Sequence, residues 1–173
     1  MSAVPIEISE VEQEARDFVQ AFKTLHLATA DKNAVATATY APFALDEDQQ
    51  FIIYVSDLSA HTPNLHRGEI VSVMLIEAEQ DAEHLFARKR LTFKCEVEKV
   101  NRDSDEFDEV MNLMQTRFGD FISYMKKLQD FHAFRLKPIH ANYVRGFAQA
   151  YEFENADFSN IRHVNDKGHK KSD

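Results

Sequence analysis

The chain has 173 residues, of which 44% are hydrophobic, and a formal net charge of −9. This length and apolar content predict a single domain, residues 1–173, with a packed core. The acidic balance argues against binding nucleic-acid backbones, no apolar run reaches membrane-spanning length, and the lone Cys95 excludes a disulfide framework. We therefore expect a cytoplasmic protein without nucleic-acid binding or membrane insertion.

The N-terminal part of the chain predicts a helix followed by strands. Ser9 and Glu12 have the spacing of a capping box, and apolar residues at helical spacing follow over residues 11–22. Residues 24–43 are rich in Ala and Thr and are interrupted by the polar turn 31–33, which predicts a β-hairpin. Residues 51–55 are apolar at every position, as in a central strand covered on both faces.

The segment from His61 to Gly68 predicts a short helix. Thr62 suits the N-cap, Pro63 the first helical position, and Gly68 the end. A helix N-terminus offers N–H groups to an anion, so His61 is a candidate ligand-binding residue beside it. Residues 70–76 then predict another buried strand, and an acidic loop follows.

The strongest strand signal lies between Leu85 and Val100, where apolar and polar residues alternate. This alternation places Arg88 and Arg90 on the face opposite Leu91. An arginine fork suits carboxylate or phosphate, so the pair predicts an anion site. A charged strand end that prevents edge-to-edge pairing is the alternative, and the spacing alone favours it.

The C-terminal half predicts two helices and two further strands. Asp103 or Ser104 opens a helix that Gly119 terminates, and a third helix runs to about Asp130. Strands follow at residues 131–136, ended by Pro138, and at 142–153, where Gly146 suggests a bulge. About six or seven short sequential strands indicate an antiparallel barrel rather than a parallel sheet.

Five motifs occur in a fixed order along the chain: Leu27–Asp31, Ala41–Phe43, Ser56–Leu65, Ala87–Leu91 and Gly146–Phe147. Together they resemble the split-barrel proteins related to pyridoxamine-phosphate oxidase. Within that group the chain is most similar to the small haem-utilisation proteins of the HutZ/HugZ type, and the resemblance runs from about Ala21 to the tail. One departure is Ala148, where the family pattern has the second glycine of Gly-Phe-Gly.

The resemblance implies a mostly β (α+β) fold, an antiparallel split β-barrel with flanking helices that forms a homodimer. It implies haem as the cofactor, held at the subunit interface. His169, on a C-terminal extension spanning residues 155–173, matches the iron ligand, and Asp130 matches an acidic residue that hydrogen-bonds this ligand from the other subunit. Arg88 or Arg90 matches a basic residue near the haem.

The function that the resemblance implies is oxygen-dependent opening of the haem ring to release iron. The partners would be an external electron donor and a possible haem-delivery protein. Two alternatives remain open. One is a flavin oxidoreductase that holds FMN phosphate with Arg88, Arg90 and the helix start at Thr62, and the other is a non-catalytic haem store or carrier. The sequence has no HExxH motif, His-Cys cluster or Ser-His-Asp order typical of zinc or acyl-transfer enzymes.

Overall fold

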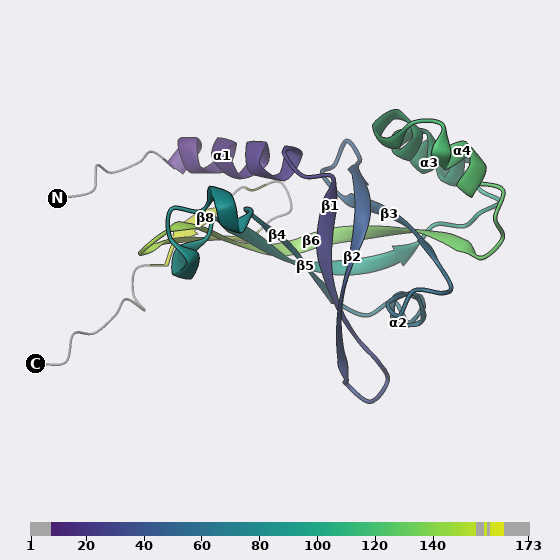
Figure 1. Cartoon of the computed structure of the whole chain (residues 1–173), viewed down its shortest axis with the longest axis horizontal. Coiled ribbons are helices and arrows are strands. Elements are labelled where there is room, and N and C mark those ends of the chain that lie inside the picture. The colour runs from purple at the N-terminus through teal and green to yellow at the C-terminus, as the bar shows by residue number, and fades with distance from the viewer. Residues whose placement is uncertain (1–7, 155–157, 159, 165–173) are drawn as a thin grey trace, which may run out of the picture.

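The computed structural model describes residues 8–154, 158 and 160–164. Six antiparallel strands form a closed barrel in the order β3-β2-β1-β4-β5-β6, because β3 also pairs with β6 (Figure 1). Two further strands, β7 and β8, extend the sheet beyond β6. The strands are β1 Thr24–Ala30, β2 Ala36–Leu45, β3 Phe51–Ser56, β4 Val71–Ile76, β5 Arg90–Lys99, β6 Phe131–Gly146, β7 Gln149–Phe153 and β8 Ile161–His163. The antiparallel barrel is confirmed.

The long strand β6 belongs to both parts of this sheet. Residues 131–136 pair with β3 and residues 141–146 with β7, while β5 pairs along the other edge. The prediction that Pro138 ends the strand is wrong. The pairing of β5 and β6 shifts between Lys94 and Cys95, and Cys95 lies opposite Pro138. A bulge tolerates a residue without an N–H group, so the strand continues past the proline.

Alternating side chains of the strands fill the barrel. Leu25, Leu91 and Phe93 are among the residues of this core, which the helix α1 (Ile8–Gln20) joins through a stripe of apolar residues. Val11, Ala15 and Val19 form the stripe at a spacing of four residues. The predicted helix is confirmed, but Ser9 lies inside it and is therefore not its cap.

A second core lies outside the barrel, where α3 (Asp105–Phe118) and α4 (Phe121–Met125) pack on β3 and β2. Ile52 and Tyr54 of β3 face these helices, whereas the alternate residues face the barrel, so the strand is buried on both faces as predicted. The Ser104 side chain accepts the Phe107 N–H and Gly119 ends α3, which confirms both signals. Within the described residues no helix is long and apolar enough to span a membrane.

Three segments differ from the prediction. Residues 85–87 form one turn of 3-10 helix, so the predicted strand from Leu85 begins only at Arg90. The predicted helix to about Asp130 ends at Met125. The predicted strand 142–153 is a hairpin, the end of β6 joined to β7, and in its turn Ala148 has a φ of 56°.

The chain after β7 contributes more structure than its polar composition predicts. Phe158 is buried against Phe93 and Phe153, with ring centroids 5.9 and 5.2 Å away. The short strand β8 then pairs with β7. His169 lies outside the described residues.

Candidate functional site

Asp130 lies in the turn before β6 and is exposed to solvent. The Ser56 hydroxyl donates to its Oδ2 at 3.0 Å, and the Asp57 backbone N–H donates to its carbonyl oxygen at 2.8 Å. Among the described residues, no donor reaches the other carboxylate oxygen. The flanking residues Gln129 and Phe131 line a pocket of about 400 Å³. The carboxylate is therefore held through one oxygen and offers the other to an incoming donor.

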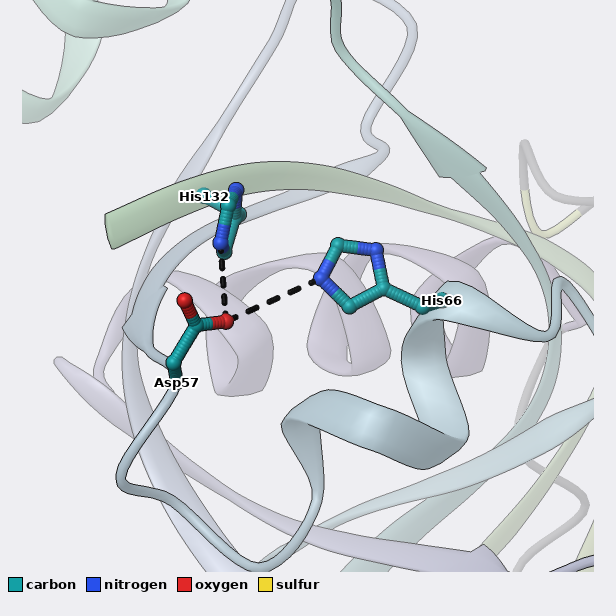
Figure 2. A group of neighbouring side chains, drawn as sticks. All are labelled: Asp57, His66 and His132. Atoms are coloured by element: carbon teal, nitrogen blue, oxygen red, sulfur yellow. Dashed lines mark hydrogen bonds and ion pairs between the residues drawn. The ribbon is translucent and has the colours of Figure 1, made fainter. Parts of the chain in front are cut away.

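The side chains of Asp57, His66 and His132 converge (Figure 2), and the backbone N–H of Asp57 donates to the Asp130 carbonyl. Asp57 follows β3, His132 lies near the start of β6, and His66 ends the short helix α2 (Thr62–His66). Asp57 Oδ1 lies 2.8 Å from His132 Nε2 and 3.9 Å from His66 Nε2. One nitrogen of each ring and one carboxylate oxygen all lie within 4.8 Å of one another.

The surroundings favour the neutral form of the His66 imidazole. Partial burial, followed by the nearby charges of Lys99 and His132, lowers the pKa of His66, and this outweighs the opposite effect of Asp57. A neutral imidazole has a nitrogen lone pair free to bind a proton or a metal ion. The group therefore combines two nitrogen donors with one anionic oxygen.

The sequence contains no spacing that would have identified these three residues together. In the sequence, His132 lies in the predicted strand 131–136, Asp57 in the motif Ser56–Leu65, and His66 in the predicted short helix. Asp57 and His66 lie close together in the chain, in the loop after β3 and at the end of α2. His132 lies much later, in β6, after α3 and α4. Only the pairing of β3 with β6 places His132 beside the end of β3.

His61 lies at the N-cap of α2 and is only 4% exposed. Its Nδ1 is 2.9 Å from the Thr39 hydroxyl, and its Nε2 is buried without a partner in the part of the chain that the structure describes. Burial lowers the pKa of this imidazole. The predicted Thr62 cap is wrong, because the Thr62 hydroxyl donates to the Ser56 carbonyl at 2.6 Å instead.

Arg88 and Arg90 lie at the opposite end of β5 from Lys99. Arg88 Nε donates to the Glu77 carbonyl at 3.1 Å, and its Nη1 lies 3.5 Å from Glu79. Arg90 Nη1 donates to the Arg88 carbonyl at 3.0 Å and makes no ion pair with any described residue. Arg88 is thus engaged by its own chain, whereas the Arg90 charge is not balanced by a described acid.

A single chain does not bring Asp130 and the arginines together. Nine residue steps of β5 separate Arg90 from Lys99, which corresponds to roughly 30 Å. Lys99 pairs with Phe134, near Asp130, whereas Arg90 pairs with Val144 at the far end of β6. Figure 1 shows α4 and β8 at opposite ends of the long axis of the molecule.

Comparison with known proteins identifies related sequences. Residues 11–145 match the family described as pyridoxamine 5'-phosphate oxidase. The protein named heme oxygenase HutZ from Vibrio cholerae serotype O1 is 40% identical over 161 residues, which are 93% of this chain and 90% of HutZ.

Solved structures show the same similarity. The crystal structure of Vibrio cholerae HutZ, described there as a heme storage protein, has a TM-score of 0.69 and 42% identity over 73% of this chain and 89% of its own. Campylobacter jejuni ChuZ has a TM-score of 0.84 and 28% identity over 97% of this chain and 68% of its own.

Proposed function

The chain belongs to the pyridoxamine 5'-phosphate oxidase family and, within it, to the haem-utilisation proteins of the HutZ type, and from this premise we propose that it binds haem and opens the ring to release iron. The observation that carries the proposal is the 40% identity to a heme oxygenase over 93% of the chain. The exposed carboxylate of Asp130 supports it from the structure.

The proposed iron ligand is His169, with Asp130 as the acceptor of its second ring N–H. A carboxylate in this position fixes the orientation of a ligating imidazole and raises its basicity. Asp130 fits the role because Ser56 holds one of its oxygens and the other is available. Bound haem would supply the iron that activates dioxygen, and the two side chains would hold and orient the haem.

The distance along β6 between the attachment point of the C-terminal residues and Asp130 supports a site shared by two chains. The Val164 N–H donates to the Ala150 carbonyl at 2.8 Å, and Ala150 pairs with Val144. Thirteen residue steps of β6 lie between Val144 and Phe131, roughly 40 Å along the strand. Five fully extended residues after Val164 span at most about 18 Å, so His169 reaches Asp130 far more readily in a second copy. We therefore propose a homodimer.

Of the two arginines, Arg90 is the better partner for a haem propionate. Arg88 is bound by the Glu77 carbonyl and by Glu79, whereas Arg90 makes no ion pair with any described residue. The same contacts weigh against FMN as the cofactor. Its phosphate would be held by Arg88, Arg90 and the helix start at Thr62. The Arg88 guanidinium and the Thr62 hydroxyl are already engaged within the chain, which leaves Arg90.

The test of haem binding is the replacement His169→Ala. We expect the variant to lose the Soret shift that haem produces in the wild-type protein, because the axial nitrogen is removed. His163→Ala, in β8, is the matched control and should keep the shift. An unchanged haem spectrum in His169→Ala would contradict the assignment, and a yellow protein with flavin absorption bands would favour FMN.

The test of catalysis separates an oxygenase from a haem store. The wild-type haem complex is incubated with ascorbate in air as external electron donor, and the Soret band is followed over time. An oxygenase loses the band and releases iron, whereas a store or carrier retains it.

Asp130→Asn should bind haem normally and degrade it more slowly, because an amide oxygen accepts the ring N–H without the negative charge. Asp120→Asn, at the N-cap of α4, is the matched control. Normal turnover in Asp130→Asn would exclude the proposed role of the carboxylate.

A further inference from the structure

We propose that Asp57, His66 and His132 bind one divalent first-row transition-metal ion. This site is separate from the proposed haem ligand His169, and it does not depend on the proposed function. Each residue contributes one donor atom, and Figure 2 shows both rings directed toward the same carboxylate.

The donor atoms are almost at the separations that an ion requires. Bonds of about 2.0–2.2 Å place neighbouring donors of one ion roughly 3 Å apart. Asp57 Oδ1 and His132 Nε2 lie 2.8 Å apart, so this pair fits already. His66 Nε2 lies 3.9 Å from the same oxygen and within 4.8 Å of the His132 nitrogen, so its side chain has to approach the other two donors by about 1–2 Å to complete the set.

The three residues are anchored to the end of β3. His132 pairs with Val55 of this strand, and the Asp57 N–H donates to the Asp130 carbonyl. The Thr62 hydroxyl donates to the Ser56 carbonyl and so holds the helix that carries His66. The donors therefore come from different elements that are joined at one point, which limits the cost of bringing them together.

Ligand chemistry decides the class of ion. Two imidazoles with one carboxylate suit zinc, iron, cobalt or nickel, whereas magnesium and calcium prefer oxygen ligands. The Asp57 side chain is 53% exposed and that of His66 is 32% exposed, so water can complete the coordination. The negative charge of Asp57 favours binding of a cation, whereas the positive charge of Lys99, which acts on His66, disfavours it.

The test uses full-length, tag-free protein without haem. Titration with Zn²⁺ by calorimetry and with Co²⁺ by visible absorption should show one equivalent bound, and Mg²⁺ in excess should not compete. His66→Ala and Asp57→Asn should weaken the binding at least about tenfold. His26→Ala, an exposed histidine on β1, is the matched control and should bind as the wild type does.

His169→Ala should also keep the affinity for zinc, because the proposed haem ligand is not part of this site. The proposal is overturned if the wild-type protein takes up no zinc or cobalt, or if His66→Ala and Asp57→Asn bind both ions as tightly as the wild type. Loss of the Soret shift together with unchanged zinc binding in His66→Ala would overturn it too, because the residue would then serve haem.

The source of such an ion is either the surrounding solution or, if the proposed function holds, haem whose ring has been opened. The haem complex is incubated with ascorbate in air and desalted, and its non-haem iron is measured. Iron retained by the wild type and lost by His66→Ala supports the site with haem as the source. Zinc uptake without such retention supports the site with free ions as the source.

Discussion

Ala148 adopts a backbone conformation that glycine adopts at the least cost. Its φ of 56° lies in the left-handed region, and it occupies the position where the family pattern has the second glycine of Gly-Phe-Gly. The departure from the family pattern at this position therefore affects the backbone conformation. The chain makes the turn without the glycine and bears the strain of a Cβ atom there.

Ala148→Gly should raise the free energy of unfolding by about 0.5 kcal/mol, because relief of the left-handed strain exceeds the added entropy of the unfolded chain. The midpoint of urea unfolding, at an unchanged m-value, measures it. Ala150→Gly, two residues later in β7, is the control and should cost about 0.5–1 kcal/mol. A destabilised Ala148→Gly would contradict the interpretation.

His61 gives stability a dependence on pH. Its pKa is lowered by burial from an ordinary value of 6.5, so below that pH the unfolded chain binds the proton more readily. The free energy of unfolding should therefore be fully retained above about pH 6.5 and fall as the pH decreases through the lowered pKa. Urea unfolding at several pH values between about 5 and 8 measures this pH dependence, because histidine side chains ordinarily titrate in that interval.

His61→Asn should flatten part of this dependence, because the amide can still bond to Thr39 but does not titrate in this range. His66, whose pKa is also lowered, should account for part of what remains. The same pH dependence in His61→Asn and wild type would show that another group is responsible.

At the scale of elements, α3 shows how local signals set the bounds of a helix. The Ser104 hydroxyl accepts the Phe107 N–H at 3.3 Å, and Gly119 ends the helix with a φ of 80°. Both residues act within one turn of the helix end, where the backbone groups have no partners of their own. The helix then covers β3 through Phe107 and Met111.

Ser104→Ala should lower the free energy of unfolding by about 1 kcal/mol, because the Phe107 N–H loses the hydroxyl acceptor and keeps only the Ser104 carbonyl. Ser123→Ala, on the exposed surface of α4, is the matched control and should change stability by less than about 0.5 kcal/mol. Chemical denaturation of both variants provides the comparison. Equal effects of the two substitutions would rule out a specific contribution from the cap.

At the scale of the whole molecule, the proposed haem site requires two chains, and mixed dimers test this. A dimer of one His169→Ala chain and one Asp130→Asn chain has one site with both residues intact and one with neither. When the two variants assemble at random, about half of the dimers are mixed, and each mixed dimer has one working site out of two. About a quarter of the wild-type activity should therefore return.

The measurement is haem degradation by co-expressed variants, with each variant expressed alone as the control. Activity in the mixture well above that of both controls would support the shared site. Activity no greater than that of the separate variants would show that His169 and Asp130 do not act across the dimer.

The sequence by itself determined the features that depend on neighbouring residues. The Ser104 cap, the Gly119 stop and the alternation of Leu91, Phe93 and Cys95 each reflect contacts or geometry within a few positions. The antiparallel arrangement of short sequential strands followed from the same local patterns, but their number did not, because six or seven were expected and the described residues form eight. The resemblance to the haem-utilisation proteins also came from short motifs in a fixed order.

Only the tertiary structure decided what depends on pairing between distant segments. Strand β6 continues past Pro138 because it forms a bulge at Ile139, where two residues of β6 match one step of β5. Arg88 donates to the Glu77 carbonyl because it precedes β5, which begins only at Arg90. The group of Asp57, His66 and His132 exists because β3 pairs with β6. Such contacts join residues far apart in the chain, and their energy depends on register and closure of the barrel, which no local pattern contains.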